Sequence, residues 1–427
     1  FAGAMALELR AKHPQITYYV AFLAGIWWLV EAIGAYRRSD WKPIGKATGW
    51  LALGSVLALL MVAQPYLSIL EYKDYSVRGA STVAAAETNG GGGMVWDKAM
   101  MWSQGPGELV TWLIADAYGG GGSSYWGPKP GTSGPHYIGG IIVFLAILAF
   151  WRIRTNTVRA FGIGAFLMSV FALGKHASWI NRPMFEYFPY FDAFRAPETW
   201  LSVVALALAV LAGYGLVYVL GGGPSDDPPE ERTRTTLIAG GSVLAVVALL
   251  WLGGNALFSF EKPGELARYR QAVAQQNQMS PSNPQVQQAA QRAVRQVKQQ
   301  RSEQFSNDAF RTVLALLLGL GLLALYRNEK IPGWIAAIGV AAIVTVDLWG
   351  VDRRYLGEEQ FSPSSDLEQQ VAEYGFDRFI KKQVGAAGGP GHFRTLPLAM
   401  NPMNWAQSSY HYQSIGGYHG AKLQLYQ

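Results

Sequence analysis

Eight long runs of apolar side chains constrain the fold of this chain more than any other feature. Runs of about 17 to 25 apolar residues have the length that a helix needs to cross a membrane. Lipid offers no hydrogen-bond partner to backbone N–H and C=O groups, so such spans must be helical. The sequence therefore predicts an all-α integral membrane protein, a polytopic helical bundle of about eight spans. The runs lie near 17–36, 48–70, 136–152, 158–174, 199–220, 236–257, 310–326 and 333–350, the third and fourth being short.

The composition supports a membrane protein and removes several other classes. Of the 427 residues, 50% are hydrophobic and only 15% are charged, below the roughly 25% charged that is typical of soluble domains. The chain has no cysteine, which excludes disulfides, thiol nucleophiles and cysteine-ligated metals. The formal net charge is +6, but no basic stripe with interleaved aromatic residues is present, so we expect no nucleic-acid partner.

Basic residues in the short loops predict the orientation, because Lys and Arg are enriched in cytoplasmic loops. The loops after the first, third and seventh runs are basic and fall on one side if the spans alternate. The acidic loop GGGPSDDPPEERTRTT lies on that side too, but acidic residues carry little weight in this rule. We expect residues 1–16, 71–135, 175–198, 258–309 and all that follow 351 to be extracytoplasmic. The basic residues are Arg37, Arg38, Lys42, Lys46, Arg152, Arg154, Arg159, Arg327 and Lys330.

This topology predicts two regions. Residues 1–352 form the multi-span transmembrane domain with its extracytoplasmic loops. Residues 353–427 form an extracytoplasmic C-terminal region, with a helix around 365–382 and a strand at GHFRTLPLAM, the start of a small α+β domain. Both ends of the sequence look cut, so we expect an internal part of a longer protein and an incomplete C-terminal region.

The stretch ELVTWLIADAYGGGGSSYWGP, residues 108–128, is too short to span yet rich in apolar and aromatic residues. Its apolar side chains predict a short helix with one apolar face, followed by an irregular glycine loop. The favoured interpretation is a loop helix that covers the bundle. The alternative is a lid or re-entrant helix that places Glu108 or Asp116 beside a substrate at the outer lipid boundary.

Two further outer segments differ in character. Segment 175–198 places Lys175, Arg182 and Arg195 among Phe and Tyr residues. Such a mixture suits a phosphate-bearing ligand or an interfacial aromatic belt, and the sequence favours neither. Segment 258–309 is rich in Gln and Ala and predicts a solvated helical hairpin broken at SPSNP, with no chemistry.

Asp347 is the most unusual single residue, because it lies inside the last run near its outer end. An ionisable group within a span is a functional candidate. The alternative is an ion pair with Arg353 or Arg354. His392, His411 and His419 lack the tight spacing of metal ligands, so no clear metal site is present.

Several stretches, in order along most of the chain, resemble the YfhO family of bacterial integral membrane proteins. They are KHPQITYY, PGELVTWLIADAYGG with YWGP and HYIGG, FDAFRAPETW, VDLWGVDRRYL and SIGGYHGAKLQLYQ. That family looks like the GT-C class of glycosyltransferases. The resemblance implies a membrane enzyme that moves a sugar from a polyprenyl-phosphate-linked donor to a cell-envelope acceptor on the extracytoplasmic face of the bacterial cytoplasmic membrane. GT-C enzymes place a catalytic carboxylate in the first outer loop, so we expect the main base to lie before residue 1.

Glycosyl transfer of the inverting kind needs a base for the acceptor hydroxyl, and positive or metal charge for the departing phosphate. For the phosphate we name Arg195, Arg182 and Lys175, with Glu108 and Asp347 as further substrate contacts. The carboxylate or base candidates are Asp116, Glu71 and Asp74. A divalent cation stays open, and the expected partners are membrane lipids, the polyprenyl-linked donor and envelope proteins.

Two other functions remain open: a transporter or flippase of lipid-linked sugars, and a non-catalytic membrane subunit of an envelope assembly. A transporter would bury charges at mid-membrane and show broken helices in paired halves. Here Glu31 and Asp347 lie toward the ends of their runs, which favours the enzyme over the transporter.

Overall fold

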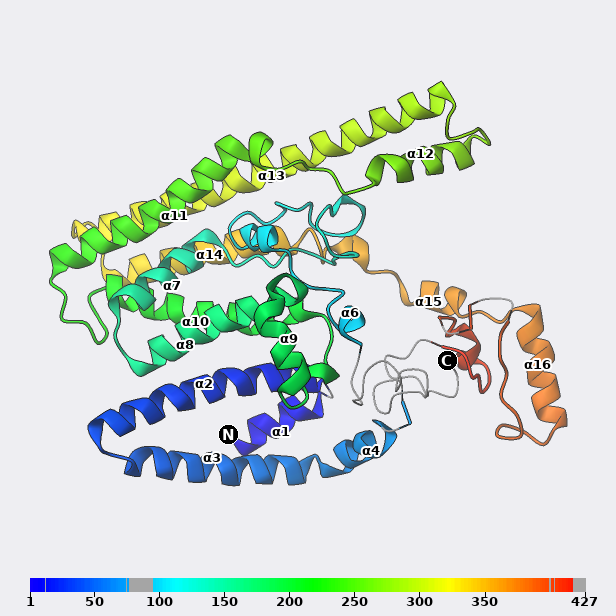
Figure 1. The fold of residues 1–427 in the computed structure, drawn as a ribbon, viewed down its shortest axis with the longest axis horizontal. Helices are drawn as coiled ribbons and strands as arrows, with labels where there is room; N and C mark the ends of the chain where they lie inside the picture. The colour runs from blue at the N-terminus through cyan, green and yellow to red at the C-terminus, as the bar shows by residue number, and fades with distance from the viewer. Residues whose placement is uncertain (12, 74, 77–94, 399–400, 403, 418–427) are drawn as a thin grey trace. The chain divides into compact units, whose positions relative to one another are not determined.

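The computed structural model describes the chain except residues 12, 74, 77–94, 399–400, 403 and 418–427, and its described residues form helices joined by irregular segments, with no strand among them (Figure 1). The chain divides into two compact units. The first, here called the membrane unit, joins Phe1–Val62 to Val95–Tyr355, and the second joins Ala63–Met94 to Leu356–Gln427. The sequence placed a boundary at 352/353, whereas the structure places it after Tyr355 and groups 63–94 with the C-terminal region.

Within its described residues, the membrane unit contains six helices that are long and apolar enough to cross a membrane, and up to seven if the bent pair of α8 with η3–α9 forms one span. The chain is therefore a multi-pass helical membrane protein. The six are α2 (Pro14–Arg38), α3 (Lys42–Met61), η5–α10 (Pro197–Val219), α11 (Pro229–Leu257), α13 (Pro284–Arg327) and α14 (Gly333–Asp352). The other elements of this unit are α1 (Ala2–Arg10), α6 (Trp96–Ala99), η1 (Pro106–Trp112), η2 (Gly122–Ser124), α7 (Gly140–Arg152), α8 (Asn156–Ala172), η3 (Gly174–Ala177), α9 (Ser178–Tyr187), η4 (Phe191–Ala193), η5 (Pro197–Trp200), α10 (Leu201–Val219) and α12 (Glu265–Gln276).

The prediction of eight full spans is corrected at three runs. The run at 136–152 forms α7, which has only 13 residues, about 20 Å at 1.5 Å per residue and so short of the hydrocarbon thickness of about 30 Å. The run at 158–174 forms α8, which bends by 110° into η3–α9. The run at 48–70 is divided between α3 and α4 (Ala63–Lys73), which belong to different units.

The helix ends follow local chemistry. Proline occupies the first turn of α2, α11 and α13, where its missing N–H and fixed φ do no harm. The Thr155 side chain caps α8 by accepting from the Val158 N–H, and the Asn283 side chain caps α13 by accepting from the Gln285 N–H. Ser39 ends α2 in the left-handed conformation, at φ 54°.

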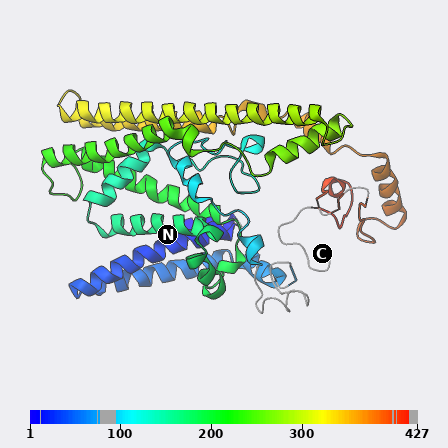
Figure 2. The ribbon, with the colours of Figure 1, turned by 45° about the horizontal axis from the view of Figure 1, so that its top comes forward.

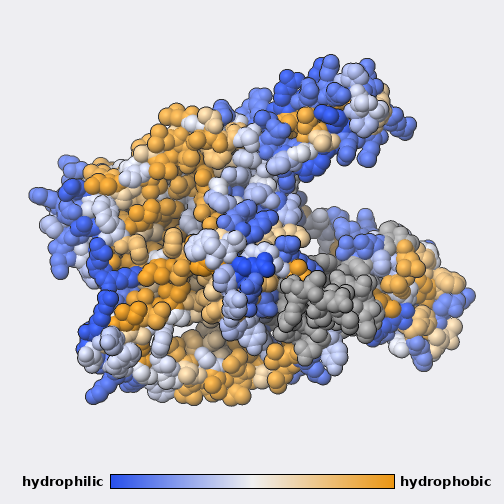
Figure 3. Space-filling model, viewed as in Figure 1, coloured by the Kyte–Doolittle hydropathy of each residue, from blue (hydrophilic) through white to orange (hydrophobic). Residues whose placement is uncertain are grey.

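The short helix α7 lies at the centre of the membrane unit, packed against α10, α11 and α13 (Figure 1). A Cβ on Gly215 of α10 would lie 2.1 Å from the Leu145 carbonyl oxygen of α7, so the close approach of these two helices requires glycine. Phe144 and Leu148 of α7 are fully buried. Apolar residues gather on the visible face over α3, α7, α8 and α11, while polar ones cover the α12–α13 hairpin (Figure 3).

The predicted helical hairpin in 258–309 is confirmed as α12 and the first half of α13, joined by a break at 277–283, and the last residue of SPSNP, Pro284, begins α13. The structure adds that α13 is one continuous helix of 44 residues that runs from the hairpin into the apolar part of the bundle (Figure 2). Val286, Ala290 and Val294 of α13 are buried, as is Ala274 of α12, so apolar side chains hold the hairpin together.

The second unit is also helical where it is described. The helix expected around 365–382 is interrupted and forms α15 (Ser364–Gln370) and α16 (Gly375–Ala386). The expected strand is wrong for the described residues 391–398, where only an isolated bridge joins Thr395 to Ser414. The side chain of Asp377 starts α16 by accepting from the Tyr374 N–H at 2.8 Å.

Candidate functional site

The segment between α6 and α7 is irregular but buried, which is unusual for a loop. The predicted helix at 108–118 is instead the seven-residue 3-10 helix η1, followed by turns, and the segment adds no span. Glu108 is 2% exposed and Asp116 is 6% exposed. Both carboxylates therefore lie inside the protein and need partners there.

The glycines at 119–122 form a packed turn. Gly119 has φ +84°, and a Cβ there would lie 2.1 Å from the Ser124 carbonyl oxygen. Gly120 has φ +60°, and its Cβ would lie 2.1 Å from the Tyr355 hydroxyl oxygen. The left-handed conformation and the close contacts both exclude larger residues, so the glycine run fixes this loop against the rest of the unit.

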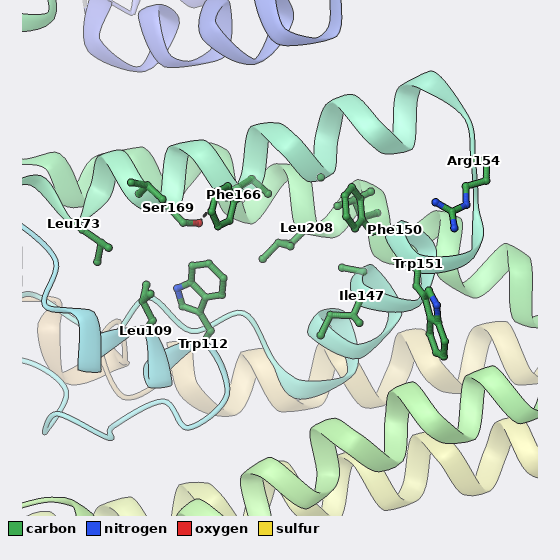
Figure 4. Close-up of a pocket in the computed structure, with 15 residues that line it drawn as sticks. Leu109, Trp112, Ile147, Phe150, Trp151, Arg154, Phe166, Ser169, Leu173 and Leu208 are labelled. Atoms are coloured by element: carbon green, nitrogen blue, oxygen red, sulfur yellow. Dashed lines mark hydrogen bonds between the residues drawn. The ribbon is translucent and has the colours of Figure 1, made fainter. Parts of the chain in front are cut away.

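A lateral apolar groove of about 700 Å³ runs along α8 (Figure 4), within the usual size range of ligand pockets. Its two ends are marked by Leu173 at the end of α8 and by Arg154 before its start. Trp112 projects between η1 and α8 (Figure 4), and its indole N–H is buried without a described hydrogen-bond partner. The lateral groove is lined by Leu109, Trp112, Ala146, Ile147, Phe150, Trp151, Arg154, Gly162, Ala165, Phe166, Ser169, Val170, Leu173, Leu208 and Leu211.

A second feature, here called the lysine cavity, surrounds the buried ammonium of Lys129. This Nζ lies 2.6 Å from Glu198 Oε2 and 3.5 Å from Glu108 Oε1, and it donates to Gln104 Oε1 at 2.9 Å. The imidazole of His136 contacts the same oxygen of Glu198, with Nε2 3.4 Å from Oε2. One carboxylate thus bridges a lysine and a histidine.

Glu108 is hydrogen-bonded at both of its carboxylate oxygens. Its Oε1 accepts from the Tyr125 hydroxyl at 2.7 Å and its Oε2 from the Gly105 N–H at 2.7 Å. Burial first, and then the charge of Glu108, raise the pKa of Tyr125, so this phenol stays a hydrogen-bond donor. The free space of the cavity is about 10 Å³, room for about one water molecule.

The lateral groove and the lysine cavity share walls at two places. The 3-10 helix η1 carries Leu109 and Trp112 on the groove and Glu108 and Thr111 on the cavity. At the Leu173 end of the groove, the Ala172 carbonyl accepts from the Gln104 N–H at 2.9 Å. The apolar lateral groove and the charged lysine cavity are therefore adjacent.

A third feature, here called the Asp–Arg chain, begins at Asp116. The Arg354 guanidinium, which follows α14, bonds Asp116 Oδ2 at 2.9 Å and both oxygens of Asp308 at 2.7 and 2.9 Å. Asp308 also accepts from the Asp116 N–H at 2.9 Å, and the Tyr355 hydroxyl donates to Asp116. These bonds join the loop to α13 and to the end of α14.

The Asp–Arg chain continues through Arg311 to Asp347. Arg311 lies 3.3 Å from Asp308 and 3.1 Å from Asp347, although its buried nitrogens donate no hydrogen bond within the described residues. Asp347 accepts from the Tyr137 hydroxyl at 2.6 Å. Arg311, and neither Arg353 nor Arg354, is thus the ion-pair partner of Asp347.

Burial raises the pKa of Asp116, and the neighbouring Asp308 adds to the rise, while the Tyr355 hydroxyl and Arg354 oppose it. Hydrogen bonding to Asp308 raises the pKa of Arg354, so the guanidinium stays charged. The Asp–Arg chain contains three carboxylates and two guanidiniums, and every carboxylate is buried. This arrangement braces the loop firmly.

The other candidates from the sequence belong to none of these three features. Lys175 is exposed in η3, two residues beyond Leu173 of the groove. Arg182 is 53% exposed and pairs with Glu186 in α9. Arg195 is half-buried and lines a small pocket of mainly aromatic side chains. Glu71 is exposed in α4 of the second unit, and Asp74 lies outside the described residues.

Four functional candidates were missed from the sequence: Lys129, His136, Asp308 and Arg311. Arg311 had a detectable signal, because it lies inside the run predicted at 310–326, where an ionisable residue is a candidate by default. Lys129 and His136 lie in the loop before α7, and Asp308 lies inside α13, and only the fold brings these three to their partners. Among the described residues, no group of three or more His, Asp or Glu side chains could hold a metal ion.

Comparison of the chain with protein-family models, with curated proteins and with solved structures gives no match. The resemblance to the YfhO family therefore remains an expectation from the sequence.

Proposed function

We propose that this chain is a membrane glycosyltransferase that takes a sugar from a polyprenyl-phosphate-linked donor and passes it to a cell-envelope acceptor on the extracytoplasmic face. One observation carries the proposal: η1 is a common wall of the lateral groove and the lysine cavity. A lipid-linked sugar has the matching two parts, a long apolar chain and a polar head. The groove would hold the chain, and the head would lie at the Leu173 end.

The charges at that end fit a phosphate. Lys175 lies two residues beyond Leu173 and is exposed, as is His176, and Lys can bind phosphate as a point charge. Arg182 is already paired with Glu186, and Arg195 lines a pocket with room for about one water molecule. The proposal therefore favours Lys175 over the two arginines for the phosphate contact.

A flippase of lipid-linked sugars is the second candidate, because the lateral groove reaches Arg154 at its far end. Its middle, however, is lined by Ile147, Phe150, Phe166 and Leu208. A charged phosphate would have to pass these apolar side chains without partners, which is costly. The groove suits a resting lipid chain better than a passing head group.

The test uses purified protein in proteoliposomes with a radiolabelled polyprenyl-phosphate sugar and a hydroxyl acceptor. Leu208→Trp places a bulky side chain in the groove. If the indole displaces about two buried methylenes of the donor's lipid chain, at about 0.8 kcal/mol each, the KM for the donor should rise about tenfold. Leu206→Trp on the same helix is the matched control, because Leu206 is 49% exposed and does not line the groove.

A second experiment measures binding of the polyprenyl phosphate without catalysis. A polyprenyl phosphate with a diazirine in its chain should crosslink to peptides of α8 and α10, and Leu208→Trp should reduce this crosslinking. Crosslinking that excess phosphatidylglycerol removes would mean that ordinary bilayer lipid fills the groove, which would overturn the proposal. Absence of transfer with every polyprenyl-linked sugar tried, despite retained crosslinking, would leave a binding protein and reject the enzyme.

A further inference from the structure

A buried salt bridge needs only two side chains, but here Glu198 contacts His136 as well as Lys129. Glu198 Oε2 contacts Lys129 Nζ at 2.6 Å and His136 Nε2 at 3.4 Å. The Lys129 side chain is 2% exposed, whereas the His136 side chain is 29% exposed. The lysine is sealed inside, and the imidazole reaches the surface of the site.

We propose that His136 is the general base of the reaction and that Glu198 orients its ring, an inference that rests on the proposed function. With the proton on Nε2 facing Glu198, Nδ1 is free to accept a proton. A carboxylate that holds the other ring nitrogen fixes the tautomer in this way in many enzymes. Within the described residues, no bond to Nδ1 is present.

The surrounding groups hold this arrangement in place. Lys129 compensates the charge of Glu198, and Glu108 with Tyr125 and Gln104 fixes Lys129 in turn. The Glu198 N–H donates to the Trp102 carbonyl at 3.2 Å. The Ile138 and Gly139 N–H groups both bond the Trp112 carbonyl, which holds the chain after His136 against η1 and so beside the groove.

The acceptor hydroxyl oxygen forms a bond to the anomeric carbon of the sugar, and the bond from that carbon to the phosphate oxygen breaks. The electron pair leaves with the polyprenyl phosphate. The hydroxyl proton moves to Nδ1 of His136, and the imidazolium formed is stabilised by Glu198 and later returns its proton to water.

The experiment measures transfer by His136→Ala, with His136→Gln as a second variant in case alanine lowers expression. General-base catalysis contributes roughly 100- to 10,000-fold, so we expect kcat to fall at least about 100-fold with donor crosslinking unchanged. Added imidazole should restore part of the rate in His136→Ala, because the side chain is partly open to solvent. His392→Ala, an exposed histidine of the second unit, is the matched control.

Glu198→Gln separates orientation from packing. Glu198→Gln keeps the size of the side chain but removes the charge that faces Nε2 of His136, so kcat should fall while donor crosslinking stays unchanged. Glu108 reaches His136 only through Lys129 and Glu198, so Glu108→Gln should lower kcat less.

The outcomes are distinct. A folded His136→Ala protein with full transfer, or one that imidazole does not rescue, would overturn the role of His136 and leave the proposed function intact. A wild-type protein that crosslinks donor but transfers no sugar would overturn both.

Discussion

Removal of Arg354 tests whether the Asp–Arg chain fastens the loop to the helices. Its guanidinium contacts Asp116 and both oxygens of Asp308, whose side chains are 7% and 1% exposed. Arg354→Ala leaves two neighbouring carboxylates buried with one fewer cation. Breaking a buried pair costs about 3–5 kcal/mol, but the Arg354 side chain is 38% exposed, so water offsets part of the loss. We expect a cost of about 2–3 kcal/mol.

The assay is a thermal melt of detergent-purified protein, followed by tryptophan fluorescence. A loss of this size should lower the melting temperature by about 5 °C. Arg353→Ala is the matched control, because Arg353 is the preceding residue and is exposed, and surface substitutions usually change stability by less than about 0.5 kcal/mol.

A third variant separates charge from packing. Arg354→Ala combined with Asp308→Asn should recover part of the lost stability, since the unpaired charge is then removed. Equal melting temperatures for Arg354→Ala and Arg353→Ala would refute the reasoning, because the Asp–Arg chain would then contribute nothing beyond a surface charge.

Two further predictions concern the other buried charges. The pKa of Asp116 is raised by burial, so its contribution to stability is full below about pH 4 and is lost as the pH rises through the raised value. Melts of wild type and Asp116→Asn between pH 4 and 8 should therefore differ in slope, and parallel curves would contradict this. Arg301 is 1% exposed and bonds Glu265 at 2.8 and 2.9 Å, so Arg301→Met should cost about 3–5 kcal/mol. Adding Glu265→Leu should recover most of it in a melt, whereas a double variant as unstable as the single one would reject the ion-pair account.

Much of the membrane unit was predictable because apolar run length directly reflects the demand of lipid for internal hydrogen bonds. The runs at 236–257 and 333–350 lie within α11 and α14. The prediction of a full span at 136–152 was wrong because HYIGG lengthens the apolar run. The helix itself begins only after Gly139, whose φ is +94°. Periodicity cannot detect a backbone turn that tertiary contacts impose.

The site was predictable only in part, for a related reason. Glu108 and Asp116 stood out as the carboxylates of 108–128. Their partners Lys129 and Asp308 are ordinary in sequence, and Asp308 lies 192 residues from Asp116. Pairings across such separations depend on how helices pack, which one sequence does not encode locally. The assignment of the hairpin to a purely solvated role failed similarly, because the buried Arg301 looks no different from its exposed neighbours until Glu265 is placed beside it.

The short helix α7 explains why a membrane protein would keep a polar, glycine-rich segment inside. About 20 Å of helix leaves about 10 Å of an ordinary hydrocarbon layer uncrossed. Irregular backbone is tolerated at that depth only where protein or water surrounds it. The buried segment that ends at Gly139 meets this condition, since η1 packs beside the groove and Asp116 is bonded to Arg354 and Tyr355. The proposed function places the head of a lipid-linked substrate beside Lys129 and His136 of this segment. A helix of full length would have to take in about seven more residues before Gly140, including His136, and would then break the bonds of the Ile138 and Gly139 N–H groups to the Trp112 carbonyl.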